Sequence, residues 1–157
     1  MCDIFKFILP CILIFSLILV IPSITSAECL PESVVPKQVR EARIVALGEM
    51  HGTMESQKFT GDLLCTLASD GRSIILGLEI PNTEQPQINA YVAGGHEDDF
   101  LKTMATSHFW NQNSQNGLAS RAMADLIKEV RALRAKGMRV QVNAVDGNPR
   151  WYELGVT

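Results

Sequence analysis

An apolar run that ends abruptly in an acid and a base is the feature that most constrains this chain. Ile44 to Leu47 is apolar and opens with two β-branched residues, which favours a strand buried on both faces. Gly48 ends the run, and Glu49 and His51 follow it, two residues apart. In extended backbone, residues with this spacing point to the same side. We therefore predict a strand over residues 42–47 that presents both side chains at its carboxyl end.

Two further apolar runs predict a sheet with helices between its strands. Residues 73–80 are apolar except near the end, where Glu79 precedes a strand-stopping Pro81. Residues 138–145 form a third candidate strand, which ends at Asp146. Apolar residues at helical spacing predict helices over 53–70, 84–92, 98–107 and 120–136. This order predicts an α/β fold with a mostly parallel sheet, βαβ crossovers and flanking helices.

The acidic and basic side chains at the strand ends are the candidate catalytic group. Carboxyl ends of parallel strands meet at one edge of the sheet, where open α/β sheets bind their ligands. His51 could act as a general base on water, with Glu49 or Glu79 orienting it and a second carboxyl group protonating the leaving group. Alternatively, Glu49, His51 and Glu79 could bind a divalent metal that activates water.

Three further residues are secondary candidates, each with a structural alternative. Asp146 belongs to an Asp-Gly pair, which is also an ordinary turn signal. Arg121 could pair with Glu79 and give that carboxylate a structural role instead. Trp110, beside Phe109, could form the wall of a pocket, although such pairs more often fill a core.

The N-terminus has the pattern of a secretory signal peptide. Residues 7–21 are almost wholly apolar, follow Lys6, and precede small residues that suit cleavage after Ala27. We predict a signal peptide over 1–27, an extended lead-in over 28–41 and an α/β domain over 42–157. The protein is then exported, periplasmic or extracellular, and meets the membrane only through this segment before cleavage.

Export changes how the cysteines are interpreted. After cleavage the chain keeps only Cys29 and Cys65. In an oxidising compartment two cysteines suggest one disulfide, which would tie the mature N-terminus to the first long helix. The alternative is a buried, free Cys65 and an unpaired Cys29.

Charge and composition exclude some partners. The net charge is −3 and charged residues make up 20% of the chain. Nothing in this balance favours binding to nucleic acid or to an anionic membrane, so a small-molecule substrate or ligand is the expected partner.

The first motif and the second strand end together resemble a known superfamily. Gly48-Glu49-Met50-His51, followed by Leu78-Glu79, is similar to the erythromycin esterase and ChaN-like (Tiki) superfamily, over residues 42–149. The esterase branch implies that His51 activates water beside Glu49 and Glu79, without a cofactor. The ChaN-like branch implies haem or iron binding, and the Tiki branch implies metal-dependent proteolysis. Our preferred hypothesis is an exported hydrolase acting on an ester-type bond.

The resemblance also implies that the chain is truncated at its C-terminus. Members are generally longer and carry a further histidine in their C-terminal half, whereas this chain ends soon after its third candidate strand. A partial sheet has exposed edges. The remaining alternatives are therefore an inactive fragment, or a homo-oligomer formed through those edges.

Overall fold

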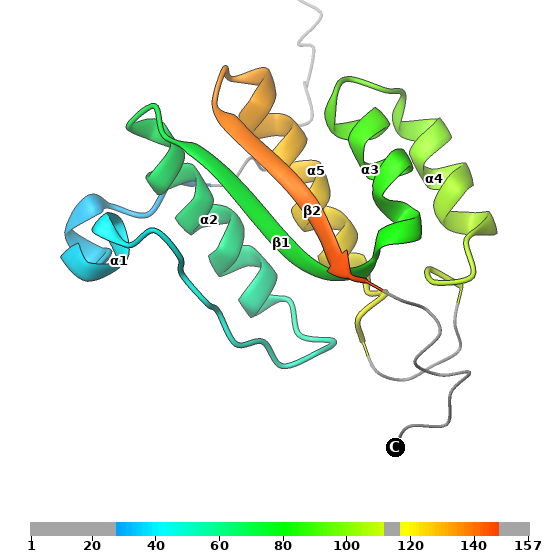
Figure 1. Cartoon of the computed structure of the whole chain (residues 1–157), viewed down its shortest axis with the longest axis horizontal. Helices are drawn as coiled ribbons and strands as arrows, with labels where there is room; N and C mark the ends of the chain where they lie inside the picture. Colours follow the sequence, from blue (N-terminus) through cyan, green and yellow to red (C-terminus); the bar gives the residue numbers. More distant parts are fainter. Residues whose placement is uncertain (1–27, 112–116, 148–157) are drawn as a thin grey trace, which may run out of the picture.

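A computed structural model describes residues 28–111 and 117–147 of this chain (Figure 1). The predictions that concern the signal peptide, residues 112–116 and residues 148–157 lie outside this range. The described elements, in chain order, are η1 (Glu32–Val34), α1 (Lys37–Glu41), α2 (Glu55–Ser69), β1 (Ser73–Pro81), η2 (Asn82–Glu84), α3 (Gln85–Val92), α4 (Glu97–Thr106), α5 (Arg121–Ala135) and β2 (Arg139–Asp146).

Two parallel strands form the sheet that the structure describes. β1 pairs with β2 in a register that runs from Ser73 opposite Arg139 to Pro81 opposite Asp146. Helices α3, α4 and α5 connect the strands, so the predicted α/β class and the parallel crossover are confirmed. Figure 1 shows the strands lying side by side across α2 and α5. Ile75 on β1 and Val145 on β2 are exposed, so the described residues do not cover the whole sheet.

The core lies between the strands and the helices that pack on them. The predicted helices over 53–70 and 120–136 are confirmed as α2 and α5, and the two shorter ones as α3 and α4. Ser120 caps α5 by accepting a hydrogen bond from the Met123 amide. Ile80, Ile127 and Val140 are fully buried where α5 meets the sheet. Each such side chain contributes about 1.5–3 kcal/mol through burial.

The predicted strand over residues 42–47 is wrong. Within the described part of the chain, these residues form no ladder with either strand. Ile44 is 87% exposed, so the run is not buried on even one face. The segment instead runs beside α2 toward the carboxyl ends of the strands (Figure 1). Apolar character predicts a strand only where a neighbouring backbone pairs with it, and here none does.

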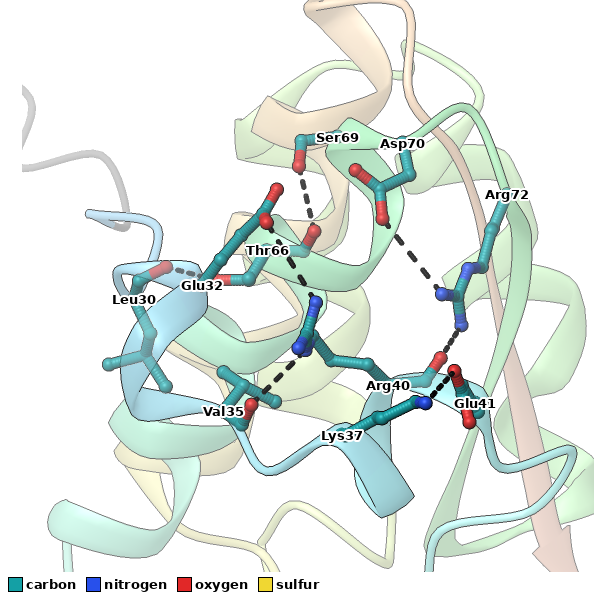
Figure 2. A network of polar contacts seen from close by, with 10 residues as sticks. All are labelled: Leu30, Glu32, Val35, Lys37, Arg40, Glu41, Thr66, Ser69, Asp70 and Arg72. Atoms are coloured by element: carbon teal, nitrogen blue, oxygen red, sulfur yellow. Dashed lines mark hydrogen bonds and ion pairs between the residues drawn. The ribbon is translucent and has the colours of Figure 1, made fainter.

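The lead-in over residues 28–41 also differs from its prediction, because it contains η1 and α1 rather than extended chain. Figure 2 shows how it is fixed to α2 and the start of β1. Thr66 on α2 donates a hydrogen bond to the Leu30 carbonyl at 2.8 Å, and Arg72 donates to the Arg40 carbonyl. A disulfide joins Cys29 to Cys65 across 36 positions of sequence. The disulfide and these hydrogen bonds thus fix the lead-in to the domain.

No helix in the described ranges is both long and apolar enough to cross a bilayer.

Candidate functional site

The structure brings Glu49, His51 and Glu79 together at the carboxyl end of β1. The His51 Nε2 atom lies 3.5 Å from a Glu49 carboxylate oxygen and 3.6 Å from a Glu79 carboxylate oxygen. Both distances exceed those of a good hydrogen bond, so these are charge contacts that strengthen when the imidazole is protonated. The His51 side chain is 35% exposed, and solvent or a ligand can reach it.

Glu49 is held in place by a buried side chain that sequence reasoning missed. Gln57, on the first turn of α2, is 3% exposed and donates from Nε2 to the Glu49 carboxylate at 2.8 Å. Its other amide atom, Oε1, is buried without a hydrogen-bond partner among the described residues. A carboxylate can only accept, so the amide must turn its NH₂ group toward Glu49. Nothing in the sequence around Gln57 indicates this role.

The backbone around His51 is a tight turn between the exposed segment and α2. Thr53 donates from both its amide and its hydroxyl to the Met50 carbonyl, at 3.2 and 2.8 Å. Its hydroxyl therefore closes this turn and does not cap α2, whose cap position is Met54. Gly52 lies in the left-handed region, with φ of 83°. Glycine adopts this conformation without steric cost.

A second glycine packs directly against this turn. Gly117, with φ of 75°, approaches the peptide between His51 and Gly52 so closely that an added Cβ would lie 2.7 Å from the His51 carbonyl carbon. Only a residue without a side chain fits there. Gly117 therefore supports the position of His51 from a segment more than sixty residues away in sequence.

The secondary candidates do not join the histidine. Arg121 pairs with Asp125 at 3.8 Å on the exposed side of α5, not with Glu79. Trp110 packs edge-to-face on Phe109, a core residue, as the structural alternative predicted. Asp146 is half-buried at the end of β2, and no described residue forms an ion pair with it. The group around His51 is thus made by Glu49, Glu79 and Gln57.

The described residues offer individual metal ligands and no complete metal-binding group. No three histidine, cysteine, aspartate or glutamate residues of the described segments are arranged to hold a metal ion. The imidazole Nδ1 has no contact from a described residue and could serve as a metal ligand. Leu47, Met50 and Met54 flank it in sequence and are exposed. Imidazole is a ligand that haem proteins use for iron.

The comparisons with known proteins identify one family. Residues 35–138 match the family described as "Haem-binding uptake, Tiki superfamily, ChaN". The match includes Glu49, Gln57, His51, Glu79 and Gly117, and covers more than half of the chain. No curated protein and no solved structure gives a significant match.

Proposed function

We propose that this chain, which belongs to the ChaN-like haem-binding family of the Tiki superfamily, binds haem at the carboxyl edge of its sheet. The family match over residues 35–138 is the observation that carries the proposal. His51 would be the protein ligand to the iron, and the exposed Leu47, Met50 and Met54 would offer apolar contacts to haem. Bound haem would supply a redox-active iron, which the side chains lack.

The residues around His51 have a defined part in this proposal. Glu49 and Glu79 lie against the imidazole Nε2 and would fix the ring's orientation, so that Nδ1 is the nitrogen that would bind iron in this proposal. Gln57 in turn fixes Glu49. Carboxylates that orient a ligating histidine also raise its basicity toward the metal. The proposed export to the periplasm or the cell exterior would place the site where external haem is encountered.

Haem titration tests the proposal. The unmodified chain should give a saturable Soret band with haemin, and His51→Ala should weaken binding at least tenfold. His108→Ala is the matched control, because His108 is an exposed histidine outside the group. Equal binding by the His51→Ala variant would contradict the assignment.

Hydrolysis is a second candidate, supported by a different observation. A single imidazole lies within 3.6 Å of two carboxylates, an arrangement in which Glu49 could orient His51 while His51 removes a proton from water. The substrate would be an ester or a similar bond, and no cofactor would be needed. A panel of aryl and alkyl esters should be hydrolysed by the haem-free chain, and not by His51→Ala or Glu79→Gln. Unchanged hydrolysis in both variants would exclude this role.

A further inference from the structure

Three arginines line a cavity at the amino ends of the strands, at the opposite edge of the sheet from His51. The cavity has a volume of about 760 Å³ and lies between the starts of both strands and the carboxyl ends of α3 and α5. Its wall contains charged and apolar side chains, chiefly Arg131, Arg134, Arg139, Ile74, Val92 and Met138. This volume is within the range of small-molecule sites.

The positive charge of this cavity has no ion-pair partner among the described residues. Within residues 28–111 and 117–147, no carboxylate forms an ion pair with Arg131, Arg134 or Arg139. Other arginines of the chain do pair, as Arg40 does with Glu32 and Arg72 with Asp70. None of the described residues that line the cavity is acidic, although the chain as a whole has a net charge of −3. Three arginines around one cavity, without an ion-pair partner in the described part of the chain, favour an anionic ligand.

Each guanidinium is held by the fold but keeps donors to spare. Arg131 stacks on the Tyr91 ring at 4.6 Å. Arg134 donates from one nitrogen to the Val140 carbonyl at 2.8 Å, and Arg139 donates to the Gly71 carbonyl. A guanidinium has five N–H donors, so each arginine can still bind a ligand. Holding the side chains in advance lowers the entropy that a ligand would have to offset.

We propose that this cavity binds a small organic anion with an apolar body, such as a carboxylate with a medium-length alkyl chain. The planar arginine forks match the two oxygens of a carboxylate. Ile74, Val92 and Met138 would remove the alkyl chain from water. A bare inorganic anion would leave the apolar wall unused, and a neutral apolar molecule would leave the cations without a partner.

Isothermal titration with sodium decanoate tests this site. Decanoate should bind with one-to-one stoichiometry, and Arg131→Gln and Arg139→Gln should each weaken binding at least tenfold. Arg121→Gln is the matched control, since Arg121 lies on the same helix α5 but outside the cavity. His51→Ala should bind decanoate like the unmodified chain, which separates this site from the proposed haem site. Decanoate affinity that is unchanged in both cavity variants would overturn the proposal.

Two other probes and one direct measurement complete the test. Equal affinity for decan-1-ol would overturn the need for an anion, and displacement of decanoate by inorganic phosphate at similar concentration would overturn the need for an apolar body. If the cavity variants do not fold, methyl NMR of the unmodified chain decides the question. Decanoate should shift the Ile74 and Met138 signals, and shifts confined to other methyl groups would refute the site.

Discussion

Gly117→Ala should disturb the candidate site, although Gly117 supports the His51 turn only through its backbone and contributes no side chain to the site. Its added Cβ would overlap the Gly52 amide nitrogen and lie 2.7 Å from the His51 carbonyl carbon, which no unshifted structure tolerates. Both neighbours are backbone atoms, so the clash cannot be relieved by a side-chain rotation. The His51–Gly52 turn must therefore move, and the contacts of His51 with Glu49 and Glu79 move with it.

The magnitude follows from two separate costs. At a φ of 75°, alanine loses about 1–2 kcal/mol relative to glycine from its left-handed conformation alone. The backbone clash adds about 1–3 kcal/mol, the usual cost of overpacking. Gly71→Ala is the matched control, because Gly71 has a φ of 76° but nothing within 4 Å of an added Cβ. The control should incur the first cost only.

Urea unfolding and histidine NMR measure the two effects. Gly117→Ala should lower the free energy of unfolding by about 1–3 kcal/mol more than Gly71→Ala does. The His51 ring signals should shift in the first variant and not in the second. Equal stability losses with unshifted His51 signals would refute the close approach of Gly117 to the turn.

Three further predictions concern stability and exchange. Replacing Cys29 and Cys65 together by serine should lower the free energy of unfolding by about 4 kcal/mol, the chain-entropy value for a loop of 36 positions, and denaturation with and without reductant would show it. The hydrogen bond that Lys128 donates to Glu97 at 3.0 Å, opposed by burial, raises the lysine pKa above its ordinary 10.5. Lys128→Met should therefore lower the free energy of unfolding by up to about 1 kcal/mol at pH 7. This difference in stability from the unmodified chain should vanish as pH rises through the raised pKa of Lys128. A difference in stability that persists at pH 12 would contradict the prediction. The backbone amide hydrogens of residues 42–48 should exchange with solvent far faster than those of β1, because no described hydrogen bond protects them. Slow hydrogen exchange would mean that a strand forms there in solution.

The elements that the sequence predicted correctly are those whose signal is local. α5 has a capping serine, a continuous apolar stripe and a glycine after its last turn, and all three act within one segment. β1 has a nearly continuous apolar sequence over nine residues, and β2 alternates apolar and polar residues over most of its eight. In these cases the local preference and the packing agree, so the sequence alone was sufficient.

The errors come from features that depend on distant partners. Residues 42–47 have the composition of a buried strand, but pairing with β1 decides whether a strand forms, and composition does not report pairing. The supporting role of Gln57 depends on its hydrogen bond to Glu49, 8 positions away in sequence. That of Gly117 depends on its contact with the turn at His51, 66 positions away. Nothing in either residue's own neighbourhood predicts such a contact.

The grouping of Glu49, His51 and Glu79 was predicted from a strand that the structure does not contain. Its geometry has another origin, because Gln57 on α2 holds Glu49, and the turn closed by Thr53 and packed by Gly117 holds His51. Only Glu79 is delivered by the sheet. The site therefore depends on the junction between the exposed segment and α2. Changes at that junction should alter ligand binding more than changes within residues 42–47, which contact little of the folded core.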